Sequence, residues 1–159
     1  MAYTETAEYS PYGSDRDSRQ KMFAALNAKD YQNALELANK ILAGNFLDVN
    51  AQFGAYVAHR ELGDADDAEK HKFFLQGLIR SIEKSGDGKT PATAFVVIST
   101  DEEYALLNWQ GLRATAQALL NQGGHSYDRM TALNPKTNET TDYYFNIDKP
   151  FNWLGKSLK

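Results

Sequence analysis

The amino-acid sequence predicts an α+β fold, with two helical hairpins followed by a small antiparallel sheet and a covering helix. Two observations lead to this prediction. Up to about residue 84, apolar residues recur at the i, i+3, i+4 spacing of amphipathic helices. Residues 123–148 instead carry two runs in which apolar and polar residues alternate, separated by a cluster of turn-forming residues. The change from a helical to a strand period predicts helices first and strands second.

Four helices are expected in the first part, at about residues 18–28, 31–42, 48–62 and 64–84. Asp30 and Asp64 stand where a side chain can cap a helix, and Gly or Asn follows the last turn of the second and third helices. The third helix is expected to face inward with Val49, Phe53, Tyr56 and Val57. The inward set of the fourth helix comprises Ala68, Lys72, Leu75, Leu78, Ile79 and Ile82.

The two helical hairpins repeat. The segment KDYQNA at residues 29–34 aligns with GDADDA at residues 63–68, at an offset of 34 residues. This offset is the period of tetratricopeptide repeats, so the helical part is predicted to be tetratricopeptide-like. Ala34 and Ala68 occupy the position at which the two helices of such a repeat cross closely, and we expect both to be buried.

Three strands are expected in the second part, near residues 94–99, 128–133 and 142–148, with a helix from about residue 101 to residue 122 packed on them. Thr100 and Glu103 have the spacing of a capping box at the start of that helix, and Gly123-Gly124 is interpreted as its end. A short apolar tail containing Phe151 and Trp153 is expected to fold back on the core.

Composition excludes several classes of function. The chain has 159 residues and a net charge of −4, and neither half of it is basic, so no nucleic-acid partner is expected. It has no cysteine, which excludes disulfides, thiolate zinc sites and a cysteine nucleophile. The longest uninterrupted apolar run is Phe95–Ile98, far too short to span a membrane. Neither a cofactor nor a metal is predicted.

Residues 1–17 are polar and are expected to be a flexible segment, followed by a single domain at 18–159 whose helical hairpins occupy 18–84 and whose strand–helix–hairpin part occupies 85–159. The start of the chain has neither the basic region nor the apolar region of a signal peptide. The protein is therefore expected in the cytoplasm if the chain is complete, and in an exported or periplasmic location if a leader was removed.

Four sequence runs carry a resemblance to a known family: FVVISTDEEYALL, GLRATAQALL, GGHSYDRM and YYFNIDKPFNWL. Together they resemble a bacterial domain-of-unknown-function family, the one numbered forty-nine nineteen, over about Tyr12 to Leu154. The resemblance implies a helical, tetratricopeptide-like first half and this ending, and it implies no particular activity. Many members of that family look exported, so the resemblance implies that this chain is exported as well.

One set of polar residues has the composition of a catalytic or metal site: Glu102, Glu103, His125, Asp128 and Asp148. A histidine with several carboxylates can support acid–base chemistry or metal binding, and a closed hairpin would bring His125 and Asp128 near Asp148. The alternative is structural, because Glu102 and Glu103 suit a helix N-terminus and the two aspartates suit strand ends. No complete ligand or nucleophile set can be assembled from these residues, which favours the structural alternative.

The function expected from the sequence is a non-enzymatic module that binds a protein or a peptide. The first helix of each hairpin would form the docking surface, with Arg19, Lys21, Gln52 and Arg60 contributing polar contacts. A solvated face without a partner is the alternative for these residues. The competing function is a small hydrolase or metal-dependent enzyme that uses the corner formed by His125 and Asp128. An extended apolar groove on the helices would favour binding, whereas convergence of His125 with two carboxylates would favour an enzyme.

Overall fold

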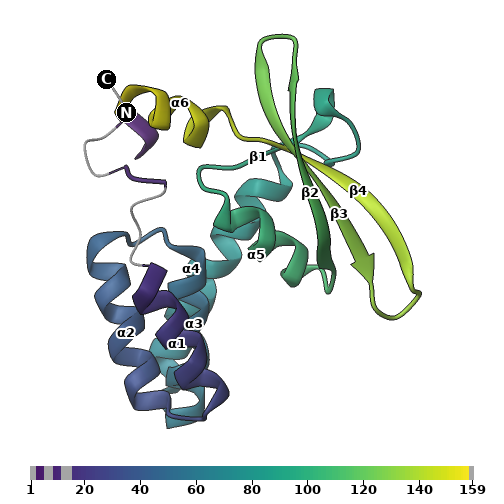
Figure 1. The fold of residues 1–159 in the computed structure, drawn as a ribbon. Coiled ribbons are helices and arrows are strands. Elements are labelled where there is room, and N and C mark those ends of the chain that lie inside the picture. Colours follow the sequence, from purple (N-terminus) through teal and green to yellow (C-terminus); the bar gives the residue numbers. More distant parts are fainter. Residues whose placement is uncertain (1–2, 6–8, 12–15, 158–159) are drawn as a thin grey trace. The chain divides into compact units, whose positions relative to one another are not determined.

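The computed structural model describes residues 3–5, 9–11 and 16–157 (Figure 1). Contacts along the chain divide it into two compact units. We call residues 13–78 the helical unit, and residues 1–12 together with 79–159 the sheet unit. The single domain expected over residues 18–159 stays a prediction.

The helical unit is built from α1 (Arg16–Asn27), α2 (Tyr31–Gly44), α3 (Val49–Leu62) and most of α4 (Ala65–Glu83) (Figure 1). Local signals place these helices. The Asp30 side chain accepts the N–H of Asn33 at the start of α2, and the Asp48 side chain accepts the N–H of Ala51 at 2.9 Å at the start of α3. The four helices predicted from the sequence are present.

Small residues dominate the core of the helical unit. Ala34 and Ala68 are both buried, as predicted. The inward face of α3 differs from the prediction, because Phe53 is exposed and Tyr56 and Val57 are only half-buried, although Val49 is buried as expected. The buried face of α3 is instead made by Ala51, Gln52, Gly54, Ala55 and Ala58.

Close helix packing explains this choice of face. A Cβ atom added to Gly54 would lie 2.4 Å from the Sδ atom of Met22, so the Met22 side chain of α1 packs directly against the backbone of α3 at Gly54. Interiors are packed to near crystal density, and small side chains let helices approach closely. The packed face of α3 is therefore made largely of small residues, and the centroid of the exposed Phe53 ring lies 6.4 Å from that of the Phe23 ring of α1.

The sheet unit contains a four-stranded sheet in the order β1-β4-β3-β2 (Figure 1). Its strands are β1 (Phe95–Val96), β2 (Arg113–Gln122), β3 (His125–Asn134) and β4 (Glu139–Asn146). The α+β class is confirmed, but the sheet is mixed, because β1 runs parallel to β4 while the other pairs are antiparallel. The first strand is also much shorter than the predicted segment 94–99. The predicted pairing of the last two strands is confirmed in the β3–β4 hairpin.

The helix predicted over residues 101–122 is wrong beyond its first half. Helix α5 covers only Asp101–Trp109, and residues 113–122 form β2. Gly111 adopts a φ of 74°, a left-handed conformation that ends the helix. Residues 113–122 are rich in helix-forming Ala, Leu and Gln, but pairing with β3 overrides this local preference.

Gly123-Gly124 closes the β2–β3 hairpin instead of ending a helix. Both glycines have positive φ angles, 61° and 82°, and the flanking residues Gln122 and His125 are paired across the turn. Two-residue hairpin loops favour such glycines because their twist matches that of the strands. The capping box is also absent, since the Thr100 side chain makes no cap hydrogen bond at the start of α5.

The core of the sheet unit lies between the sheet and α5. Its most buried apolar side chains include Val97, Leu106, Leu107, Met130 and Phe145. Two short 3-10 helices, η1 (Tyr3–Glu5) and η2 (Pro91–Thr93), lie outside the sheet. The expected apolar tail forms helix α6 (Asp148–Ser157), which contacts β3.

The expected flexible segment 1–17 lies partly outside the described residues, which omit 1–2, 6–8 and 12–15. Among the described residues of this segment, Tyr9 is buried and its hydroxyl donates to the carbonyl oxygen of Ile98 at 2.7 Å. This bond ties residue 9 to the sheet unit.

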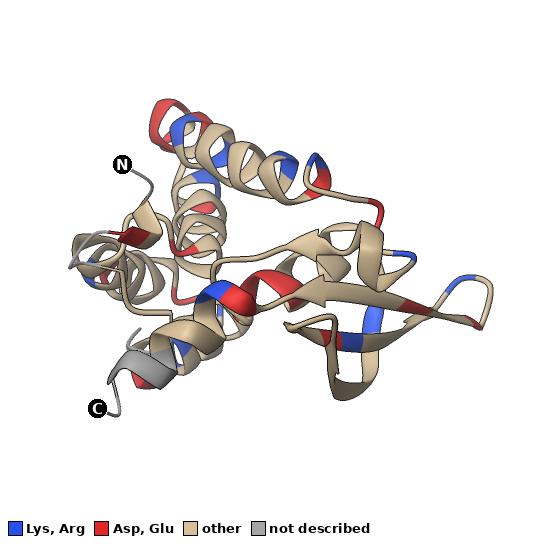
Figure 2. Cartoon of the chain, turned by 90° about the horizontal axis from the view of Figure 1, so that it is seen from above, with Lys and Arg blue, Asp and Glu red and all other residues tan. Residues whose placement is uncertain are grey.

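Charge and hydropathy of the described residues agree with the composition. Lys and Arg are interspersed with Asp and Glu along the helices and strands drawn in Figure 2. None of the described helices has the length and the apolar character needed to cross a membrane.

Candidate functional site

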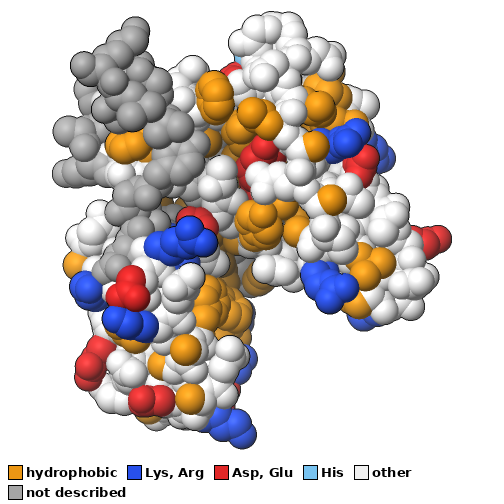
Figure 3. Space-filling view, in the orientation of Figure 1, with side chains coloured by type: hydrophobic (Ala, Val, Ile, Leu, Met, Phe, Trp, Pro, Cys, Tyr) orange, Lys and Arg blue, Asp and Glu red, His pale blue; other side chains and the backbone are white. Residues whose placement is uncertain are grey.

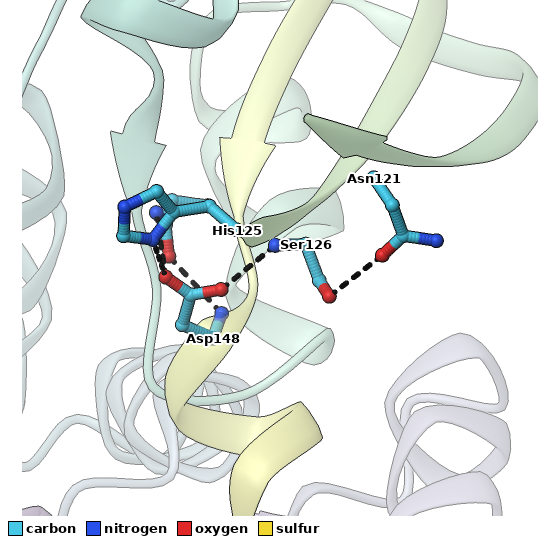
Figure 4. A network of polar contacts seen from close by, with 5 residues as sticks. Asn121, His125, Ser126 and Asp148 are labelled. Carbon is cyan, nitrogen blue, oxygen red and sulfur yellow. Dashed lines mark hydrogen bonds and ion pairs between the residues drawn. The ribbon is translucent and has the colours of Figure 1, made fainter. Parts of the chain in front are cut away.

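His125 and Asp148 meet at the end of the β3–β4 hairpin, as the sequence predicted for a closed hairpin (Figure 4). The Nδ1–H of His125 donates to Oδ2 of Asp148 at 2.5 Å, because an ionised carboxylate can only accept. The other carboxylate oxygen, Oδ1, accepts the backbone N–H of Ser126 at 2.8 Å, and the Asn146 amide donates to Oδ2 at 3.2 Å. Asp148 thus joins the start of β3 to the end of β4.

These bonds set the acidity of Asp148. Burial alone would raise the pKa of its carboxyl, but the hydrogen bonds from Ser126, His125 and Asn146 stabilise the anion and hold the pKa below its ordinary value. The His125 side chain is 57% exposed, so more than half of its surface is in contact with solvent.

Ser126 does not complete a nucleophile–base–acid set with His125. Its hydroxyl donates to Oδ1 of Asn121 at 3.0 Å, on the neighbouring strand. Figure 4 shows the His125 ring and the Ser126 hydroxyl on opposite sides of β3, as expected for successive strand residues. A serine nucleophile must reach the histidine that activates it, and this one points away.

Glu103 and Asp128 form a second polar pair, between α5 and β3. Glu103 is fully buried, and Asp128 is 5% exposed. Burial raises the pKa of Glu103 to about 9, and the adjacent Asp128 carboxyl contributes to the increase. Neither oxygen of Glu103 has a hydrogen-bond partner of good geometry among the described residues, so the Asp128 carboxyl acts on it chiefly as a neighbouring charge.

Asp128 is held by a short chain of polar side chains. The side-chain Nε2 of Gln117 donates to Oδ2 of Asp128 at 2.7 Å, and the Tyr104 hydroxyl donates to the side-chain Oε1 of Gln117 at 2.9 Å. The pKa of Asp128 is raised by burial, against the lowering effect of Gln117. A proton on Glu103 keeps two neighbouring buried carboxyls from both being charged.

Glu102 has a structural contact of its own. Its Oε2 atom accepts the backbone N–H of Ile98 at 2.8 Å, which ties the start of α5 to the segment after β1. Burial raises the pKa of Glu102 to about 7, although this hydrogen bond opposes the shift.

The five polar residues predicted as one set are therefore separated. His125 pairs with Asp148, Glu103 pairs with Asp128, and Glu102 binds backbone. His125 and Asp128 are three positions apart on β3 and project to opposite faces of the strand. Among the described residues, no group of three or more His, Cys, Asp or Glu side chains could hold a metal ion.

The residues predicted to form a docking surface are also distributed differently. Arg19 is buried and bonded to Asp48 at 2.7 Å, inside the helical unit. Lys21 and Arg60 have exposed side chains that bond to Asp17 and Glu61. Binding by Lys21 and Arg60 stays a prediction, whereas a buried Arg19 has no surface to offer.

Gln52 is fully buried and links two elements. Its Nε2 atom donates to the carbonyl oxygen of Phe46 at 2.8 Å, and its Oε1 atom accepts Nδ1–H of His71 at 2.7 Å. The amide thereby ties the α2–α3 connection to α4. Burial lowers the pKa of His71, which favours the neutral ring at neutral pH.

An apolar hollow lies beside this link, on the surface of the helical unit. A pocket of about 160 Å³ is lined by Phe46, Leu47, Phe73, Phe74, Gly77 and Leu78. A wider and shallower hollow of about 530 Å³ adjoins it, and Asp66, Glu69 and Lys70 complete its lining beside the same Phe73 and Phe74. We call these nine residues together the α4 groove.

The α4 groove exposes large aromatic side chains. Phe73 is 73% exposed, Phe46 48% and Phe74 41%. The rings of Phe46 and Phe74 meet edge to face at 4.8 Å, so the α2–α3 connection and α4 form one surface. Figure 3 shows hydrophobic side chains reaching the surface in both parts of the chain.

The α4 groove was not predicted from the sequence, although a signal for it exists. The buried residues of α4 in the helical unit are Ala68 and Leu75, which follow the predicted inward stripe. Phe73 and Phe74 fall outside that stripe, and two adjacent phenylalanines on the outer face of a helix indicate a surface that is not simply solvated.

Comparisons with known proteins place the chain in a family. The model of a family described as a domain of unknown function (DUF4919) matches residues 1–155. Searches of curated proteins and of solved structures found no match. Because the family model covers nearly the whole chain, this protein belongs to the DUF4919 family.

Proposed function

We propose that this protein is a non-enzymatic module that binds a protein or a peptide, and that the α4 groove is its docking surface. The observation that carries the proposal is the cluster of Phe46, Phe73 and Phe74, all exposed, around an apolar pocket. Single exposed apolar residues are ordinary, but a contiguous apolar surface with a hollow is typical of an interaction site.

The groove is held in shape before any partner arrives. Gln52 fixes the backbone of Phe46 against His71 of α4, and the Phe46 ring rests on Phe74. A preformed site loses less conformational entropy on binding than a mobile one. This supports binding as the role of the groove.

The helical repeat supports the same proposal. Tetratricopeptide-like hairpins pack through small residues, and Ala34 and Ala68 are buried at the two equivalent positions. Helical repeat surfaces bind extended partners. The surface of α1 and α3 that carries Lys21 and Arg60 is the alternative docking surface expected from the sequence.

The geometry offers less support for a hydrolase or a metal-dependent enzyme at the corner of His125 and Asp128. His125 contacts one carboxylate, that of Asp148, and Asp128 lies on the other face of β3. The bonds of Asp148 join strand ends, which is a structural use of a carboxylate.

The test is selection of peptides by the full chain. A random dodecapeptide library displayed on phage is panned on the immobilised protein, and an enriched peptide is titrated against variants. We expect Phe73→Ser to weaken binding about tenfold or more, because this exposed ring offers contact area in the groove. The matched control Lys21→Glu/Arg60→Glu, on α1 and α3, is expected to bind like the wild type.

Three results would change the proposal. If no peptide is enriched over the bare matrix, the binding function is wrong. If the double charge variant loses binding and Phe73→Ser keeps it, the docking surface lies on α1 and α3. Turnover of a generic ester, phosphate or peptide substrate by the wild type would contradict a non-enzymatic function.

A further inference from the structure

The α4 groove follows one face of a single helix. Asp66, Glu69, Lys70, Phe73, Phe74 and Gly77 recur along α4 at spacings of three and four residues, which places them on adjacent turns of the same face. Phe73 and Phe74 line both hollows, so the two are continuous. The groove therefore has a charged end toward the start of α4 and an apolar end farther along.

The apolar end has the size of one large side chain. Its volume is about 160 Å³, and an apolar cavity of about 150 Å³ is known to accept a benzene-sized group. Gly77 contributes to this space, since no atom lies within 4 Å of the position where its Cβ would be. A leucine, isoleucine, methionine or phenylalanine side chain matches this pocket in size and polarity.

The charged end is acidic. Three charged side chains line it, and Asp66 and Glu69 outnumber Lys70. The Nζ atom of Lys70 is bonded to Asp67 at 2.8 Å, outside the groove lining, which directs its charge to that carboxylate. The Nζ atom of Lys72 forms an ion pair with Oε1 of Glu69 at 2.9 Å, and both side chains lie at the surface. The excess of carboxylate at this end complements a positive group on a ligand.

The spacing of the two ends defines the ligand further. Asp66 and Phe74 are eight positions apart, which is about 12 Å along a helix at about 1.5 Å per residue. An extended peptide covers this length in about four residues at about 3.3 Å each. An extended ligand thus places its positive group about four positions from its apolar anchor.

We propose that the α4 groove binds a linear peptide segment of a partner protein, with one bulky apolar side chain in the pocket lined by Phe46, Phe74 and Gly77 and a Lys or Arg side chain against Asp66 and Glu69. This rests on the proposed binding function and specifies its ligand. The apolar anchor supplies most of the affinity, because exposed ion pairs contribute little in water. The basic residue supplies the choice of partner and of direction.

Two groove variants test the apolar end. Gly77→Leu fills the pocket with a side chain, and Gly77→Ala adds only a Cβ atom into open space and favours the helix. Peptides enriched from the dodecapeptide library are expected to bind the alanine variant nearly as well as the wild type and the leucine variant about tenfold or more weakly. Circular dichroism and thermal melting check that both variants fold, and Phe73→Ser, at a highly exposed position, replaces Gly77→Leu if the latter does not.

One pair of substitutions tests the acidic end. Asp66→Lys/Glu69→Lys is expected to weaken the binding of an enriched peptide several-fold at low salt. The effect should be smaller at high salt, because screening reduces the interaction of surface charges. A second peptide has Glu in place of the Lys or Arg of the enriched peptide. It should bind the wild type more weakly than the original peptide does, and it should bind the double variant more strongly than the original peptide does. Such an exchange of preference identifies direct pairing.

The expected result is a set of enriched peptides that share a bulky apolar residue and a Lys or Arg about four positions away. Enriched peptides without a basic residue, or binding that Gly77→Leu leaves unchanged, would overturn this ligand while the binding function stands. Absence of any enriched peptide would overturn both. Self-association of the chain in sedimentation experiments that Phe73→Ser abolishes would assign the groove to a second copy instead.

Discussion

Gln52 in the helical unit and Glu103 in the sheet unit are nearly the same in shape, and both are fully buried. Gln52 uses both ends of its amide, one to Phe46 and one to His71. Neither oxygen of Glu103 has a hydrogen-bond partner of good geometry among the described residues, and the charged group that raises its pKa most is another carboxyl, that of Asp128. Burial is therefore not what distinguishes them.

The difference lies in how each side chain can be neutralised. An amide carries no charge and needs only partners, so Gln52 connects two elements in a way that does not itself titrate. A buried carboxyl needs a proton when no cation is near, so Glu103 makes the sheet unit depend on pH. Two equally buried polar groups thus have opposite consequences for stability.

The largest effect is expected for Glu103 itself. Its pKa is about 9 in the folded chain against an ordinary 4.5, so the folded state retains a proton that the unfolded state has lost. The stability from this group is complete below about pH 4.5 and is lost as the pH rises toward 9. Between these two pH values the free energy of unfolding of the wild type should fall by an amount on the order of 5 kcal/mol because of this group. The Glu103→Gln variant should lack that decrease.

Urea unfolding of the wild type and of Glu103→Gln, followed at about pH 5 and about pH 9, measures this effect. The variant should be much the more stable of the two at the higher pH. Glu102, whose pKa is about 7, and Asp128 have raised pKa values and add to the wild-type loss in the same direction. Equal pH dependence of the two proteins would show that Glu103 is not the group that titrates.

Removing the amide of Gln52 is expected to have the next largest effect. Gln52→Leu keeps a similar volume but leaves the Phe46 carbonyl and the His71 ring without their partner, at a cost of about 3 kcal/mol. The destabilisation by Gln52→Leu should be nearly independent of pH over the range in which the effect of Glu103→Gln on stability changes most. Peptide binding to the α4 groove should weaken as well, whereas a variant with unchanged stability would contradict the role of this link.

Packing at the repeat position should have a smaller effect. Ala68→Leu adds a bulky group at a buried site and should destabilise the helical unit by about 1–3 kcal/mol. Ala28→Leu is a suitable control, because Ala28 is exposed just after α1. Thermal melting that is unchanged in Ala68→Leu would mean that the repeat alignment is wrong.

The smallest effect is expected for His125, which represents a third case, an exposed partner of a well-bonded carboxylate. His125→Ala removes one of several bonds to Asp148 and should cost about 0.5–1 kcal/mol, because solvent screens the pair. Asp148 has a lowered pKa, so its contribution is present above its ordinary pKa and is lost in acid. The loss in His125→Ala should therefore be smaller in strong acid than at neutral pH.

Elemental analysis complements that measurement. A stoichiometric metal in the wild type that disappears in His125→Ala would contradict a structural role for the histidine. Such a result would support the metal-dependent alternative.

Local signals predicted much of the fold. The capping residue Asp30 marks the start of α2 as predicted, and strict alternation in β3 and β4 indicated their hairpin. Strand β2 was missed because its Ala, Leu and Gln residues favour helices, and its pairing depends on a distant strand. The pair Gly123-Gly124 was the available signal, since two such residues between two runs favour a tight hairpin.

The polar sites were predictable only where the chain itself brings residues together. His125 and Asp148 lie at the two ends of one hairpin, so their contact follows from its closure. Glu103 reaches Asp128 only because α5 lies over the sheet, which no local pattern specifies. The α4 groove depends on which apolar side chains the rest of the chain leaves uncovered, and that is a property of the whole fold.

Strand β2 has a consequence for handling the protein in concentrated solution. It is an edge strand of the sheet, and its ten residues include a single charged side chain, that of Arg113. An edge strand of this kind can pair with the same edge strand of another molecule and start fibrillar aggregates. The regular pairing of β2 with β3 is interrupted only by the irregularity between Ala114 and Ala116. A lysine at the exposed position 119 would act as a gatekeeper and lengthen the time for which concentrated stocks remain clear.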